Sequence, residues 1–78
     1  MKKEQKDHVI KQCKRELKEY RINTDGLTFK VTADEVIYKT EMMTLNVLVN
    51  YKGETLFQFS EVYIDDNFNI LQWHLYFN

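Results

Sequence analysis

Residues 45–64, LNVLVNYKGETLFQFSEVYI, decide the fold, because they read as two β-strands joined by a tight turn. Apolar side chains recur at every second position from Leu45 to Tyr51, which is the period of one face of a strand. The turn is predicted at Lys52-Gly53, because glycine tolerates the positive φ of a short hairpin loop. This stretch therefore predicts an antiparallel hairpin against which the rest of the chain can be placed.

The second strand of this hairpin is apolar on both faces when the same period is applied. One predicted face carries Phe57, Phe59 and Tyr63, and the other carries Leu56, Val62 and Ile64. A strand with two apolar faces is usually central in a sheet or covered on both sides. This observation motivates the main functional hypothesis.

The remaining sequence predicts one helix and further strands. The helix is expected at 4–21, and strands are expected at 27–32, 35–40, 43–51, 55–64 and 69–77. The helix has an apolar stripe at helical spacing, made of Val9, Ile10, Cys13, Leu17 and Tyr20. Residues 33–43 are open between one strand, two strands and a helical turn, because Thr32 to Glu35 also matches a helix capping box.

Short connections between consecutive strands favour an antiparallel meander. The helix must bury its stripe, and the sheet face is the large apolar surface available for this. We therefore expect a single α+β domain, 1–78, with an N-terminal helix packed on a four- to five-stranded antiparallel meander. This layout resembles that of cystatin-like folds. The inhibitory Gln-x-Val-x-Gly loop of cystatins is not present, so the resemblance implies the layout and no inhibitory residues.

Composition excludes several classes of protein. The single cysteine, Cys13, excludes an internal disulfide and a cysteine-rich metal site. No run of about 18 apolar residues exists, and no apolar segment follows the basic N-terminus, so neither a membrane span nor a signal peptide is expected. The cytoplasm is the expected compartment. Abundant lysine, asparagine, isoleucine and tyrosine favour an AT-rich source, such as a low-GC bacterium or its phage.

The charge of the chain is divided unequally. Residues 1–21 hold eight Lys or Arg against four Asp or Glu, a net charge of +4, whereas residues 22–78 hold three against eight, a net charge of −5. A solvated helix beside an acidic sheet explains this division, and so does a helix that meets an acidic partner. Nucleic acid is disfavoured as that partner, because the aromatic residues lie outside the basic segment and the pI is about 6.1.

No motif for catalysis, cofactor binding or metal binding is recognisable. His8 and His74 are the only histidines, and neither has nearby residues at the spacing of metal ligands. Asp65-Asp66-Asn67 resembles the start of a calcium loop but lacks its glycine and distal glutamate, so a turn is expected there. The chain is not expected to be an enzyme or to need a cofactor.

The leading hypothesis is a small non-catalytic protein-interaction module that pairs through its sheet or its acidic surface, with itself or with another protein. A phage-type inhibitor of a host protein fits this size. The residues expected to bind the partner are Phe57, Phe59, Tyr63, Trp73, Phe77, Glu61, Asp65 and Asp66. The alternative is a small-molecule-binding domain with a pocket between helix and curved sheet, with Tyr38, Tyr63 or His74 as polar groups. An enzyme that uses His74 with a carboxylate ranks third.

Overall fold

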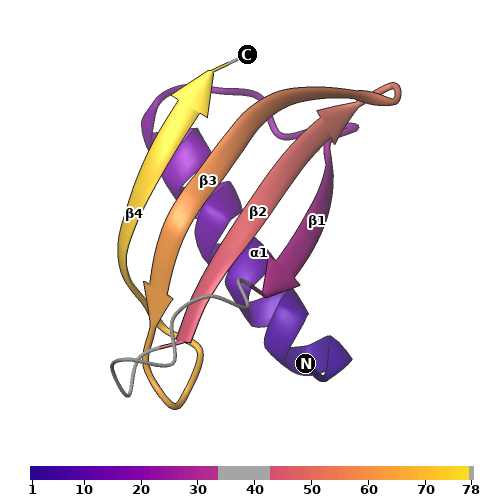
Figure 1. Cartoon of the computed structure of the whole chain (residues 1–78). Coiled ribbons are helices and arrows are strands. Elements are labelled where there is room, and N and C mark those ends of the chain that lie inside the picture. The colour runs from indigo at the N-terminus through magenta and orange to yellow at the C-terminus, as the bar shows by residue number, and fades with distance from the viewer. Residues whose placement is uncertain (34–42, 78) are drawn as a thin grey trace.

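The computed structural model of the chain describes residues 1–33 and 43–77. Its elements are α1 (Lys3–Glu19), β1 (Thr28–Ala33), β2 (Met43–Tyr51), β3 (Glu54–Ile64) and β4 (Ile70–Phe77). The strands form one antiparallel sheet in the order β1-β2-β3-β4, and α1 crosses one face of it (Figure 1). The predicted helix on an antiparallel meander is therefore confirmed. The strand predicted at 35–40 lies outside the described residues.

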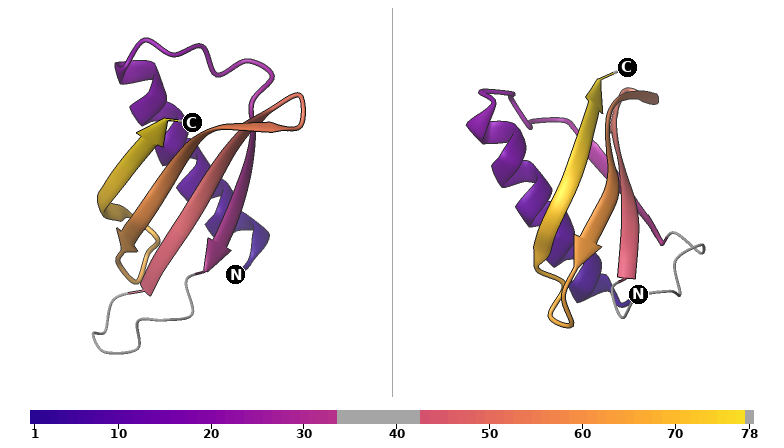
Figure 2. Two further views of the ribbon diagram at one scale, coloured as in Figure 1. Left: turned by 45° about the horizontal axis from the view of Figure 1, so that its top comes forward. Right: turned by 60° about the vertical axis from the view of Figure 1, so that its left-hand side comes forward.

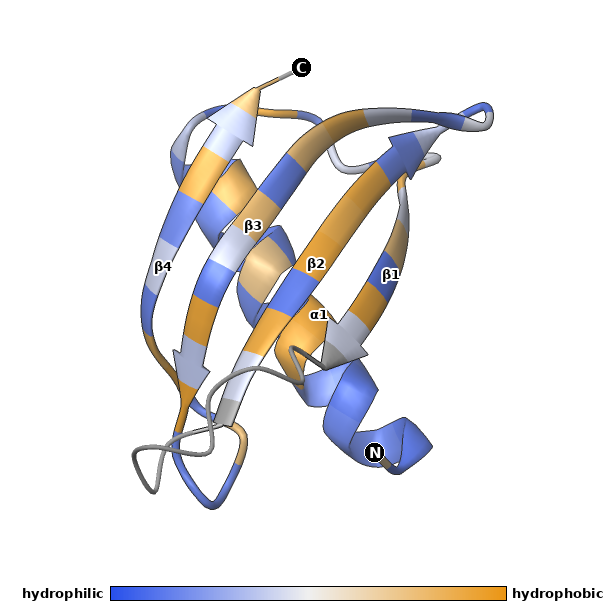
Figure 3. Ribbon diagram, viewed as in Figure 1, coloured by the Kyte–Doolittle hydropathy of each residue, from blue (hydrophilic) through white to orange (hydrophobic). Residues whose placement is uncertain are grey.

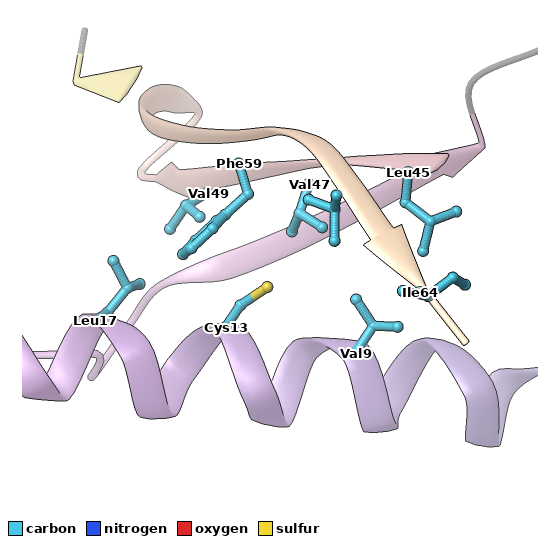
Figure 4. Packing of buried hydrophobic residues seen from close by; sticks show 9 residues of the cluster. Val9, Cys13, Leu17, Leu45, Val47, Val49, Phe59 and Ile64 are labelled. Atoms are coloured by element: carbon cyan, nitrogen blue, oxygen red, sulfur yellow. The ribbon is translucent and has the colours of Figure 1, made fainter. Parts of the chain in front are cut away.

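The core lies between α1 and the face of the sheet turned toward it. Every third or fourth residue of the helix is buried there, and the strands contribute alternate residues from the opposite side (Figure 4). The buried apolar side chains are Val9, Cys13, Leu17, Leu45, Val47, Val49, Phe59, Val62 and Ile64. At roughly 1.5–3 kcal/mol per fully buried aliphatic or aromatic side chain, this cluster is the main stabilising contribution to the fold.

The C-terminus of α1 is closed by hydrogen bonds that turn the chain out of the helix. Arg21 adopts a left-handed conformation, with φ of 60°. Its N–H donates to the carbonyl of Lys18 at 2.9 Å, and the N–H of Ile22 donates to the carbonyl of Leu17 at 3.0 Å. This is the pattern of a Schellman motif, and the apolar contact expected between its ends is supplied by Ile22, which packs on the core. The helix therefore ends at Glu19, two residues before the predicted boundary.

The β2–β3 hairpin has the predicted tight turn. Lys52 and Gly53 both have positive φ, 48° and 83°, and Tyr51 pairs with Glu54 across the loop. Positive φ at both central residues is the type I′ geometry, whose twist matches that of the flanking strands. The turn therefore fixes the register of the hairpin.

A β-bulge in β3 overturns the prediction that this strand is apolar on both faces. Phe59 lies opposite Val47 and Val62 lies opposite Leu45, so two β3 residues, Ser60 and Glu61, face one residue of β2. Glu61 has φ of 51°, which is unusual for a residue with a side chain. The extra residue reverses the alternation, so Val62 and Ile64 turn toward the helix and join the core.

The face of the sheet that points away from α1 is mainly polar. Its cross-strand rows include Lys30–Leu48–Gln58–Tyr76, Thr32–Asn46 and Ser60–His74. Hydrophilic and hydrophobic segments alternate along β3 and β4 in Figure 3. The expectation that both sheet faces are apolar is thus wrong, because it extended a strict two-residue period through the bulge.

Candidate interaction surface

Three of the aromatic residues predicted to bind a partner lie on the helix side of the sheet. Phe59 is 1% exposed and belongs to the core. Phe57 and Trp73 are half-buried and pack against that core. Phe59 therefore stabilises the fold and offers no exposed surface to a partner.

Phe77 is different, because it is 63% exposed at the C-terminal end of β4. It pairs with Phe57 across the strands, and the two rings meet edge to face with centroids 5.2 Å apart and an interplanar angle of 87°. Edge-to-face geometry is a favourable arrangement for two aromatic rings. The ring of Phe77 is thus held in place by Phe57 while most of its surface faces solvent.

The remaining predicted residues of β3 lie around the bulge on the polar side. Tyr63 is half-buried and pairs with Thr44 and Gln72. Glu61 Oε2 lies 3.4 Å from His74 Nε2, and both side chains are about half exposed. An exposed contact of this kind, which is an ion pair only when His74 is protonated, contributes little to stability.

Asp65 and Asp66 lie in the loop between β3 and β4. The carboxylate of Asp65 accepts hydrogen bonds from the backbone N–H groups of Asn67 and Asn69, each at 2.9 Å, and from the Asn69 side-chain amide at 3.1 Å. These bonds, above all that from the Asn69 backbone, lower the pKa of the Asp65 carboxyl. Asp65 therefore organises the loop, whereas Asp66 is exposed.

Sequence reasoning did not single out Gln12, which connects α1 to this loop. Its Nε2 donates to the carbonyl of Phe68 at 2.8 Å, and its Oε1 accepts the N–H of Ile70 at 2.8 Å. Nearby, His8 Nε2 lies 2.8 Å from Asn69 Oδ1. The sequence feature that could have identified Gln12 is its position on the apolar stripe of the helix, three residues after Val9. These contacts fix the point at which β4 begins.

The outer edge of β4 is unpaired within the described residues. β4 is the last strand in the sheet order, so within the described residues only β3 pairs with it. The right-hand view of Figure 2 brings β4 forward and shows its outer edge with no described element in front of it. Three large hydrophobic side chains of β4 are exposed: Leu71 at 54%, Tyr76 at 55% and Phe77 at 63%.

The two edges of the sheet differ in charge and length. β4 has eight residues, ILQWHLYF, without a lysine, arginine, acidic residue or proline. β1 has six residues and carries Lys30 in its middle. Edge strands of soluble proteins usually carry a charge, a proline or a bulge that discourages pairing with another chain. Lys30 gives β1 such protection. In β4 the corresponding feature is the bulge at the extra residue, Leu71.

The described residues line at least two surface depressions elsewhere. One, of about 390 Å³, is on the exposed face of α1 and is lined by His8, Lys11, Gln12, Lys14, Arg15 and Lys18. The other, of about 280 Å³, is lined at the far end of the sheet by Ile22, Asn23, Asp25, Leu27, Tyr51, Leu56 and Phe57. Neither includes Tyr63 or His74, the polar groups expected for a small-molecule pocket, and Tyr38 lies outside the described residues.

The described part of the chain holds no group of three or more His, Cys, Asp or Glu side chains that could bind a metal ion. Among the same residues, no helix is both long enough and apolar enough to cross a membrane. Comparison of the chain with protein-family models, curated proteins and solved structures gave no match. The comparisons thus do not confirm the likeness to cystatin-like folds.

Proposed function

We propose that the protein is a non-catalytic protein-interaction module whose binding surface is the free edge of β4. The observation that carries this proposal is an uncharged eight-residue edge strand with three exposed hydrophobic side chains. A partner segment that pairs with β4 gains backbone hydrogen bonds along the strand, and its side chains gain contacts with the exposed ones. Aromatic residues such as Tyr76 and Phe77 are those that interfaces favour.

The position of these aromatic residues on a fixed scaffold supports the proposal. Phe77 is held against Phe57, and the start of β4 is fixed by the hydrogen bonds of Gln12. A binding strand that is already ordered loses little conformational entropy when a partner docks. The proposal includes a specific use of this edge, in which a phage-type inhibitor binds a host protein through β4.

Affinity capture with two matched variants tests the proposal. Tyr76→Lys adds a positive charge on the polar face of β4, and Thr28→Lys adds one on the polar face of β1, at an exposed position in each case. In extracts of the cells that produce the protein, we expect partners retained by the wild-type protein to be retained by Thr28→Lys and lost with Tyr76→Lys. An unchanged set of retained proteins with Tyr76→Lys would refute binding through β4.

A further inference from the structure

We infer that the partner of the β4 edge is a second copy of this chain, which pairs antiparallel about a two-fold axis at His74. This inference rests on the proposed function. It joins the two four-stranded sheets into one continuous eight-stranded sheet with both helices on the same side.

The composition of β4 permits pairing with itself. In a two-fold pair each residue meets a residue of the same strand, so a charged side chain near the axis would meet its own like charge. β4 carries no Lys, Arg, Asp or Glu, and no proline that would remove a backbone donor. β1 would bring Lys30 close to its own copy. The β4 edge is therefore the one suited to this symmetry.

The position of the axis follows from the alternation of side chains. Residues that lie opposite each other in a sheet point to the same side, so the two-fold axis must pass at a residue and not between two residues. An axis at His74 places Phe77 near Leu71 of the partner, which brings together two of the three exposed hydrophobic side chains of the strand twice per dimer. An axis at Trp73 or Leu75 would shift the two strands by two residues, so Phe77 would no longer lie near Leu71 of the partner.

Charge complementarity at the ends of the strands supports the same arrangement. The C-terminal ends of α1 and β4 lie at one end of the molecule, as Figures 1 and 2 both show, and the exposed Lys18 and Arg21 lie there. The β3–β4 loop, with Asp65 and Asp66, lies at the other end of β4. Antiparallel pairing sets Lys18 and Arg21 of each copy at the same end as Asp65 and Asp66 of its partner.

Disulfide formation at the axis tests this inference with few confounding effects. Cys13 is buried, so an introduced surface cysteine is the only accessible thiol. In His74→Cys, the two cysteines would lie opposite each other with Cα atoms about 4.5–5.5 Å apart, which is within the range of a disulfide. We expect mild oxidation to yield mainly covalent dimers of His74→Cys, detected on a non-reducing gel.

Two control variants test the register and the edge. In Tyr76→Cys the cysteines would lie about 13 Å apart, four residues along the strand, so cross-linking should fall at least tenfold. Thr28→Cys places an exposed thiol on β1 and should give equally little dimer. Similar cross-linking in all three variants would overturn the inference, because it would reflect random collision.

The mass of the wild-type protein gives a measurement that does not depend on cysteine. Sedimentation at about 100 µM should give twice the chain mass of 9.5 kDa. His74→Lys, which places two lysines opposite each other at the axis, should weaken association at least tenfold. A wild-type monomer without a His74→Cys cross-link overturns the inference. If a Tyr76→Lys-sensitive partner is still captured, the proposed function survives with a different partner; if none is captured, both proposals fail.

Discussion

Gln12 shows how a single polar side chain can determine where a strand begins. It is largely buried on the helix, and its amide satisfies one backbone acceptor and one backbone donor of the β3–β4 connection. Buried backbone groups that lose such partners are costly, because water does not replace them. The amide of Gln12 therefore links the position of α1 to that of β4.

Replacement of Gln12 by leucine should lower the free energy of unfolding by about 2–4 kcal/mol, because two backbone groups lose their partners. Lys11→Leu is the control, since Lys11 lies on the exposed face of α1 and its replacement should change stability by less than about 0.5 kcal/mol. Urea unfolding followed by circular dichroism measures both variants. Equal stabilities for the two would show that the amide is dispensable.

Cys13 gives the fold a dependence on alkaline pH. Burial, with a smaller contribution from Glu16, raises the pKa of the folded thiol to about 12 from its ordinary value of 9.0. The unfolded chain therefore loses this proton first, so the stabilising contribution of the neutral thiol is complete below pH 9 and is lost as pH rises from 9 to 12.

The stability advantage of the wild-type protein over Cys13→Ala should thus shrink by about 2–3 kcal/mol between pH 8 and pH 11. The two proteins differ only at residue 13, so the contributions of all other groups cancel in the difference. Urea unfolding at a series of pH values measures it. A difference that stays constant with pH would mean that the folded thiol ionises normally.

At the scale of elements, the bulge at Glu61 determines which side chains of β3 enter the core. With φ of 51°, this position suits glycine and disfavours a β-branched residue. Glu61→Gly should be within about 0.5 kcal/mol of the wild-type protein or more stable, whereas Glu61→Val should cost about 1–2 kcal/mol. Thermal unfolding ranks these variants. Gln58→Gly, in the regular part of β3, should cost about 1 kcal/mol, and a similar cost for Glu61→Gly would contradict the assigned backbone conformation.

The helix and the β2–β3 hairpin were predictable from the sequence, because long periodic stretches and a Lys-Gly turn are local signals. The side of the sheet to which each β3 side chain points was not predictable from the sequence. One inserted residue reverses every side chain after it, and no glycine marks the site. The same error led to the prediction of two apolar faces. Phe77, named from the sequence as a partner-binding residue, is exposed, and its role in binding stays a prediction. The predicted meander already placed the last strand at an edge, but it did not show which side chains of that strand are exposed.

For the whole molecule, the separation of charge matters more than the net charge of −1. Lys18 and Arg21 near the end of α1 and the acidic β3–β4 loop lie at opposite ends of β4, so they would attract each other in the proposed antiparallel dimer. Lys18→Glu/Arg21→Glu should therefore weaken self-association about tenfold at low salt, and Lys3→Glu/Lys6→Glu, with the same change in net charge at the other end of α1, should affect it less. Sedimentation at two salt concentrations measures this. Equal effects of the two pairs would indicate a response to net charge alone.

The difference between the two margins of the sheet also limits the size of any assembly. Pairing through β4 would occupy that edge in each copy, and Lys30 would discourage pairing through β1, so the proposed assembly would stop at two copies. Replacement of Lys30 by valine would remove this protective charge, and dimers could then pair with one another through their β1 edges. The expected product is an elongated polymer that scatters light and binds an amyloid dye, from a protein that otherwise stays small.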